Sequence, residues 1–153
     1  MAEENNETRG YQQSAEPAPD LRALDRLVGD WQVSGDYVEG TSHFEWMEGG
    51  FFLIQRYDFE TPDGRKVEGV EIIGHERPFG AEPSEHVKSR AYHNTGDTLD
   101  YVYELEGDTL IIWGGEKGSP AYFRGEFSAD DDILAGHWHW PGGGYEATST
   151  RVK

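Results

Sequence analysis

Two histidines alternate with two tryptophans in the segment GHWHWPGGGYE, which runs from Gly136 to Glu146. On a β-strand, His137 and His139 point to the same face and lie about 7 Å apart along the chain. Such a pair binds one zinc ion when a neighbouring strand supplies a third ligand, and the expected pairing places Glu146 opposite His139. The same face also carries charged and polar side chains, whereas the reverse face is aromatic. We therefore expect a polar ladder on the outer face and no metal site.

A second set of chemically capable residues lies in the segment 65–75, where acidic residues alternate with apolar ones. If Glu68 or Glu71 points inward, it meets Gln55 and Arg90 and forms a buried acid–base group. The motifs of serine hydrolases, zinc proteases and phosphate-binding loops are absent. The chain also has no cysteine, which excludes disulfides, thiolate metal sites and a cysteine nucleophile.

The elements that position these residues are short strands separated by turn residues. The chain has 20 glycines, five tryptophans, eight tyrosines and seven phenylalanines among its 153 residues, which is typical of an all-β domain. A long antiparallel up-and-down meander usually closes into a barrel, because closure removes the exposed edge strands. We therefore predict a closed antiparallel up-and-down barrel of about ten strands. The expected strands are Trp31–Val38, Ser42–Met47, Phe51–Glu60, Arg65–His75, Glu85–Asn94, Thr98–Glu106, Thr109–Gly114, Ala121–Ser128, Ile133–Trp140 and Tyr145–Val152.

One helix is expected before the first strand. Leucines recur at near-helical spacing between Leu21 and Val28, Asp20 is the expected N-cap, and Gly29 ends the segment. This short helix would plug one end of the barrel. Residues 1–19 are polar and acidic and contain two prolines, so they are expected to form a disordered tail, with the barrel domain spanning residues 20–153.

Pairing across short turns indicates which side chains face the lumen. A two-residue loop at Gly107-Asp108 pairs Leu105 with Leu110, and one at Asp131-Asp132 pairs Phe123 with Trp140. For the strand over 85–94, two registers stay open: Ser89, Ala91 and His93 inward, or Lys88, Arg90 and Tyr92 inward. The loop Arg77–Ser84 is the expected lid over the mouth. The predicted ligand-binding residues are Phe51, Leu53, Gln55, Tyr57, Tyr101, Tyr103, Phe123, Trp138 and Trp140.

The charge and hydropathy of the chain restrict its partners. The net charge is −17 at pH 7, which disfavours nucleic acid and anionic membranes as partners because both repel an acidic surface. The longest apolar run, Phe51–Ile54, is far too short to span a bilayer, and no signal peptide is evident. We expect a cytoplasmic protein, either a monomer or a homodimer.

The motif LVGDW, with Gly29 and Trp31 after a short helix, resembles the calycin superfamily of lipocalins and fatty-acid-binding proteins. In that superfamily the tryptophan packs at the closed base of the barrel against an arginine near the end of the last strand. The resemblance implies that Arg151 is this partner and that the contact is a structural cation–π stack. The segments LDRLVGDW, WMEGGFFLIQRYDF, GVEIIG and WPGGGYEATSTRV look most like uncharacterised bacterial lipocalin-like barrels, over about residues 21–152.

The resemblance leaves three functions open. The first is binding of a small, largely apolar molecule in the lumen, without a cofactor. The second follows from a more distant resemblance to nitrobindin, a haem barrel whose ligating histidine lies near the C-terminal end, and is haem-dependent or acid–base catalysis in the lumen. The third is a barrel filled by its own side chains that acts through its surface.

Overall fold

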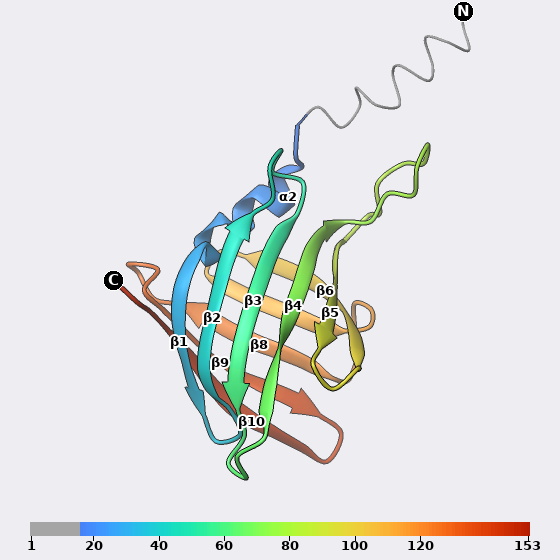
Figure 1. The fold of residues 1–153 in the computed structure, drawn as a ribbon. Coiled ribbons are helices and arrows are strands. Elements are labelled where there is room, and N and C mark those ends of the chain that lie inside the picture. The colour runs from blue at the N-terminus through green and yellow to red at the C-terminus, as the bar shows by residue number, and fades with distance from the viewer. Residues whose placement is uncertain (1–15) are drawn as a thin grey trace, which may run out of the picture.

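Ten antiparallel strands close into a barrel in the computed structural model, which describes residues 16–153 (Figure 1). Each strand pairs with the next in sequence, and β1 pairs with β10. The predicted all-β, up-and-down barrel with one short N-terminal helix is therefore confirmed. The strands are β1 Gly29–Gly35, β2 Glu39–Trp46, β3 Leu53–Glu60, β4 Lys66–His75, β5 Val87–His93, β6 Thr98–Glu106, β7 Thr109–Gly114, β8 Tyr122–Phe127, β9 Ile133–Trp140 and β10 Gly143–Arg151.

The helix begins two residues earlier than the sequence predicts and is capped differently. Helix α2 (Pro19–Arg22) continues directly as the 3₁₀ helix η1 (Ala23–Leu27). Proline suits the first turn of a helix because its missing N–H would have no intrahelical partner there. Asp20 is not the N-cap: Ala18 holds that position without a side-chain cap, and Asp20 instead contacts Nε2 of His75 at 2.8 Å. The predicted tail lies outside the described residues except for its last four positions.

The helix closes one end of the barrel with its apolar face. Leu21, Leu24 and Leu27 are each at most 3% exposed and join the core of the barrel. Figure 1 shows α2 lying across the barrel end at which β1 begins and β2 ends. We call this the helix-covered end, and the opposite end the mouth.

Trp31 and Arg151 lie against each other at the helix-covered end. The Arg151 guanidinium carbon is 4.2 Å from the centroid of the Trp31 ring, and the two residues are direct partners in the β1–β10 pairing. The indole N–H of Trp31 donates to the carbonyl of Leu27 at 2.8 Å. Arg151 donates to the carbonyls of Val28 and Arg26 at 2.6 and 2.7 Å. These bonds satisfy carbonyls where the helix ends and join it to the last strand.

The β8–β9 hairpin has a longer loop than the predicted two residues. The backbone N–H of Ser128 donates to the carbonyl of Ile133 at 2.8 Å, so four residues form the loop. Phe123 therefore pairs with Trp138 and not with Trp140. The error is two residues, and since side chains alternate with a period of two, the predicted inward face is preserved.

The β9–β10 hairpin turns earlier than predicted. Its loop is Pro141-Gly142, so Gly143 pairs with Trp140 and lies within β10. As a result Glu146 pairs with His137, not with His139. The predicted position of Glu146 opposite His139 is therefore wrong.

The long loop Arg77–Ser84 does not lie over the mouth. Successive connections of a meander alternate between the two ends of the barrel, and the β4–β5 connection falls at the helix-covered end. Figure 1 shows this loop projecting at the same end as α2. The predicted lid is therefore wrong. The mouth is bordered instead by the β1–β2, β3–β4, β5–β6, β7–β8 and β9–β10 connections.

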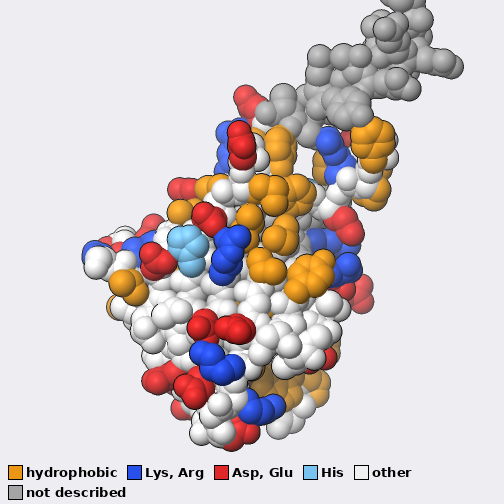
Figure 2. Space-filling model, in the orientation of Figure 1, with side chains coloured by type: hydrophobic (Ala, Val, Ile, Leu, Met, Phe, Trp, Pro, Cys, Tyr) orange, Lys and Arg blue, Asp and Glu red, His pale blue; other side chains and the backbone are white. Residues whose placement is uncertain are grey.

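The outer face of the barrel is mixed in character. Acidic and basic side chains are interspersed over the view in Figure 2, and hydrophobic side chains gather over β3 and β4 near the helix-covered end. On this outer face Ile54 pairs with Ile72, and Val70 pairs with the exposed Tyr92. These residues alternate with the inward-facing ones that form the site.

Candidate functional site

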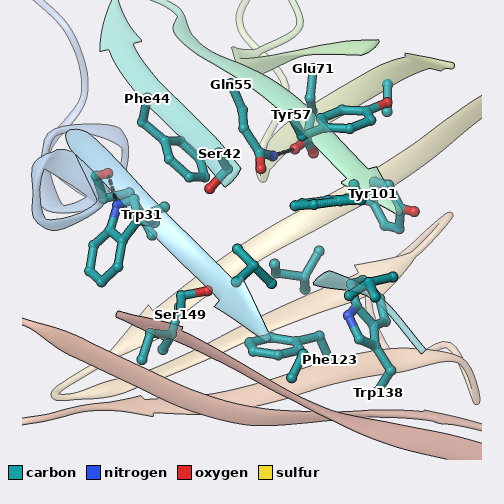
Figure 3. A pocket seen from close by; sticks show the side chains of 18 of the residues that line it. Trp31, Ser42, Phe44, Gln55, Tyr57, Glu71, Tyr101, Phe123, Trp138 and Ser149 are labelled. Atoms are coloured by element: carbon teal, nitrogen blue, oxygen red, sulfur yellow. Dashed lines mark hydrogen bonds between the residues drawn. The ribbon is translucent and has the colours of Figure 1, made fainter. Parts of the chain in front are cut away.

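The lumen contains a cavity of about 280 Å³ between the helix-covered end and the mouth (Figure 3). The barrel is therefore not filled by its own side chains. Leu27 and Trp31 form its floor. Of the predicted ligand-binding residues, the ones that contribute to its wall are Gln55, Tyr57, Tyr101, Tyr103, Phe123 and Trp138.

The other three predicted residues do not line the cavity. Phe51 lies in the β2–β3 connection, because Gly49 and Gly50 turn the chain and β3 begins only at Leu53. Leu53 points inward but is wholly buried in the core beneath the helix. Trp140 follows the correct alternation, yet it lies at the last position of β9 and is 41% exposed at the mouth. Alternation predicts whether a side chain points into or out of the barrel. The position of the residue along the barrel axis decides whether that side chain lines the cavity.

Several lining residues were not among the predicted ones. They include hydroxyl and apolar side chains whose inward direction follows from the register with Trp31, such as Ser42 on β2 and Ser149 on β10. In Figure 3 the hydroxyls of Ser42 and Ser149 point toward the space between the labelled side chains. The alternation of β1, β2 and β10 would have indicated Val33, Ser42, Phe44, Tyr145, Ala147 and Ser149.

A buried carboxyl group forms the polar part of the wall. Glu71 is 4% exposed and accepts hydrogen bonds from Ser89 Oγ at 2.6 Å, from Tyr103 Oη at 2.9 Å and from Gln55 Nε2. Burial raises the pKa of Glu71, and the three hydrogen bonds oppose this shift because they favour the charged form. Arg90, proposed from the sequence as its partner, faces outward and pairs with Asp100 at 2.7 Å. The strand β5 therefore has the register with Ser89, Ala91 and His93 inward.

Phenol groups surround this carboxyl. The hydroxyl of Tyr57 is hydrogen-bonded to Nδ1 of His93 near the mouth. Burial and the charge of Glu71 raise the pKa of Tyr57 to about 12. The same two causes raise the pKa of Tyr101 and Tyr103. At neutral pH these phenols are therefore protonated and act as hydrogen-bond donors within the lumen.

Glu71 should make the stability of the fold depend on pH in a predictable direction. Its pKa is raised in the folded state above the ordinary value of 4.5, so the folded state holds the proton more tightly than the unfolded state. This contribution to stability is present below pH 4.5 and is lost as the pH rises through the folded-state pKa. Each unit of difference between the two pKa values corresponds to about 1.4 kcal/mol.

The variant Glu71→Gln removes this titration. We expect the free energy of unfolding of the parent, minus that of Glu71→Gln, to fall as the pH is raised from 5 to 9 in urea unfolding experiments. Glu68→Gln is the matched control, since Glu68 lies on the same strand but is exposed. A difference that stays constant with pH for Glu71→Gln, as for the control, would contradict the assignment.

The histidine pair of β9 lies on the outer face and away from the cavity. The rings of His137 and His139 stack with centroids 4.4 Å apart, and the ring of Tyr122 stacks on His139 at 4.8 Å. Within residues 16–153 no group of three or more histidine, aspartate or glutamate side chains is arranged to hold a metal ion. The cavity wall contains one histidine, His93, so the two histidines considered for haem ligation do not reach the lumen.

The fold and the cavity together define a class: closed ten-strand antiparallel meander barrels with an internal cavity, an architecture consistent with a calycin-like fold. No family model matches this chain, and no curated protein matches it at a significant level. In the described part of the chain, none of the helices has the length and apolar character needed to cross a membrane.

Proposed function

We propose that this protein binds a small, largely apolar organic molecule in the lumen of its barrel. The observation that carries the proposal is the cavity of about 280 Å³, whose wall is mostly aromatic and aliphatic and contains a few convergent polar groups. Sites of this composition are typical of small-molecule binding, because the apolar wall supplies affinity and the polar groups orient the ligand. The volume suits a small ligand.

The aromatic part of the wall contains two groups of rings in contact with each other. The ring of Trp138 lies 5.9 Å from that of Tyr101 and 5.3 Å from that of Phe123, and Tyr57 stacks on Phe59 at 5.5 Å. Flat apolar ligands pack well against such surfaces. We further propose that the chain belongs with the bacterial lipocalin-like barrels that its motifs resemble, a proposal that the contact between Trp31 and Arg151 supports.

Titration with N-phenyl-1-naphthylamine, a neutral apolar fluorophore, tests the proposal. We expect its emission to rise on binding, with energy transfer from the two tryptophans that line the cavity, Trp31 and Trp138. The variant Ala147→Leu should abolish binding, because Ala147 lines the cavity and its larger replacement would occupy the lumen. Ala135→Leu on the outer face of β9 is the matched control and should bind as the parent does.

Trp138→Phe should lower the energy transfer more than Trp140→Phe does, because Trp138 lines the cavity and Trp140 lies at the exposed rim. If Ala147→Leu folds normally by circular dichroism and still binds the probe with parental affinity, binding takes place elsewhere. The lumenal function would then be wrong.

A further inference from the structure

Within residues 16–153, the cavity wall contains an acidic side chain but neither lysine nor arginine. The described side chains that line the cavity include one carboxyl group, that of Glu71, and one imidazole, that of His93, which is hydrogen-bonded to Tyr57, but no lysine or arginine. Arg151 does not line the cavity: its guanidinium is bonded to the carbonyls of Val28 and Arg26 and lies against the Trp31 ring. An anionic ligand would therefore find no lysine or arginine in the lumen and would be repelled by Glu71 in its ionised form.

Glu71 itself lacks a cationic partner among the residues that line the cavity. Its oxygens accept hydrogen bonds from three neutral donors, those of Gln55, Ser89 and Tyr103. Buried carboxylates are ordinarily compensated by a cation, because hydrogen bonds alone replace only part of the lost hydration. In its ionised form Glu71 therefore has no lysine or arginine in the cavity wall as counter-charge, and burial without such a partner raises its pKa.

Gln55 adds a hydrogen-bond acceptor directed at the same space. The amide nitrogen of Gln55 donates to the carboxyl of Glu71, so the amide oxygen faces away from it. Figure 3 shows this oxygen at the tip of the Gln55 side chain, turned toward the space between Gln55 and the rings of Tyr57 and Tyr101. No described residue donates a hydrogen bond to it.

We infer that the ligand of this cavity is a primary organic amine on an aromatic or similarly apolar skeleton. Its ammonium group donates to the free oxygen of Gln55 and compensates Glu71, while its skeleton lies along the aromatic wall that ends at Trp138. The faces of these aromatic rings attract a cation further. The net charge of −17 also raises the local concentration of cations around the protein. This inference rests on the proposed lumenal function and adds the chemical class of the ligand.

Three compounds with one skeleton and different charge test the inference: 2-phenylethylamine, 2-phenylethanol and phenylacetate, each titrated calorimetrically at pH 7. We expect the amine to bind about tenfold or more tightly than the alcohol, since a close buried charge pair has a coupling of that size. Phenylacetate should bind more weakly than the alcohol. These comparisons use the parent protein alone, so they do not depend on the folding of any variant.

The variant Glu71→Gln should abolish the preference for the amine, measured as the ratio of its affinity to that of 2-phenylethanol in the same variant. Glu68→Gln, exposed on the same strand, should retain the preference. If the alcohol or phenylacetate binds the parent as tightly as the amine does, the ligand class is wrong while lumenal binding stands. The same conclusion follows if the amine fails to bind and N-phenyl-1-naphthylamine binds. If neither the three compounds nor the neutral probe binds, both the inference and the proposed function fail.

Discussion

Replacing Trp31 with alanine should lower the free energy of unfolding by about 3–5 kcal/mol, the usual cost of deleting a large core side chain. Trp31 is 1% exposed and is the largest of the fully buried side chains. It packs in the core with the three leucines of the helix and forms the floor of the cavity. Its removal leaves a large void at the point where the helix, the first strand and the last strand meet.

The loss extends beyond the tryptophan itself. Without the ring, the guanidinium of Arg151 loses its cation–π contact, and the carbonyl of Leu27 loses the indole N–H that donates to it. Both contacts hold the helix against the barrel. The measurement is urea unfolding followed by far-ultraviolet circular dichroism, because fluorescence would be altered by the substitution itself.

Trp140→Ala is the matched control for this experiment. The side chain of Trp140 is 41% exposed at the mouth, so the same substitution there should cost less than about 1 kcal/mol, in line with other surface changes. A Trp31→Ala protein as stable as the Trp140→Ala protein would show that the helix-covered end does not depend on this residue.

Leu53→Ala should lower the free energy of unfolding by about 2–5 kcal/mol, the range observed for buried leucines. Leu53 is 0% exposed, pairs with Ile73 across β3 and β4, and belongs to the core beneath the helix. Leu53 does not line the cavity. Where the variant is folded, its affinity for N-phenyl-1-naphthylamine should therefore lie within about a factor of two of the parental affinity, a difference in binding free energy of less than about 0.5 kcal/mol.

Leu99→Ala deletes the same atoms at a position on β6 that is 36% exposed, and it should cost less than about 1 kcal/mol. The result that would contradict our placement of Leu53 is a stable Leu53→Ala protein with strongly weakened probe binding. Such a protein would put Leu53 in the ligand site, as the sequence predicts, and not in the core.

The sequence by itself determined the architecture of this protein. Turn residues at regular intervals and alternating apolar residues define ten strands, and a meander of that length closes on itself because closure satisfies every edge. The inward faces of β3, β6, β8 and β9 were also predictable, since alternation depends only on parity, whereas those of β4 and β5 stayed open. Trp138 was therefore correctly placed on the inner face, although the sequence paired Phe123 with Trp140 and the structure pairs it with Trp138. A shift of two residues leaves the face unchanged.

Only the tertiary structure decided how far along the barrel axis each inward residue lies. That position depends on hairpin loop lengths, which the glycine-rich turns left ambiguous: Gly143 and Gly144 belong to β10 and not to the turn. Leu53, Gln55 and Trp140 share an inward direction, yet the first lies in the core, the second lines the cavity and the third lies at the rim.

The polar cluster in the lumen likewise required the assembled barrel. Glu71, Ser89 and Tyr103 come from three strands and meet only when the registers of β4, β5 and β6 are set together. The sequence left Glu68 and Glu71 as alternatives, because they lie on opposite faces of one strand and its pattern alone does not decide which face points inward. It also does not show which hydrogen-bond donors surround the inward acid. A hydrogen-bond network between strands is a property of register, and register is decided by the packing of the whole barrel.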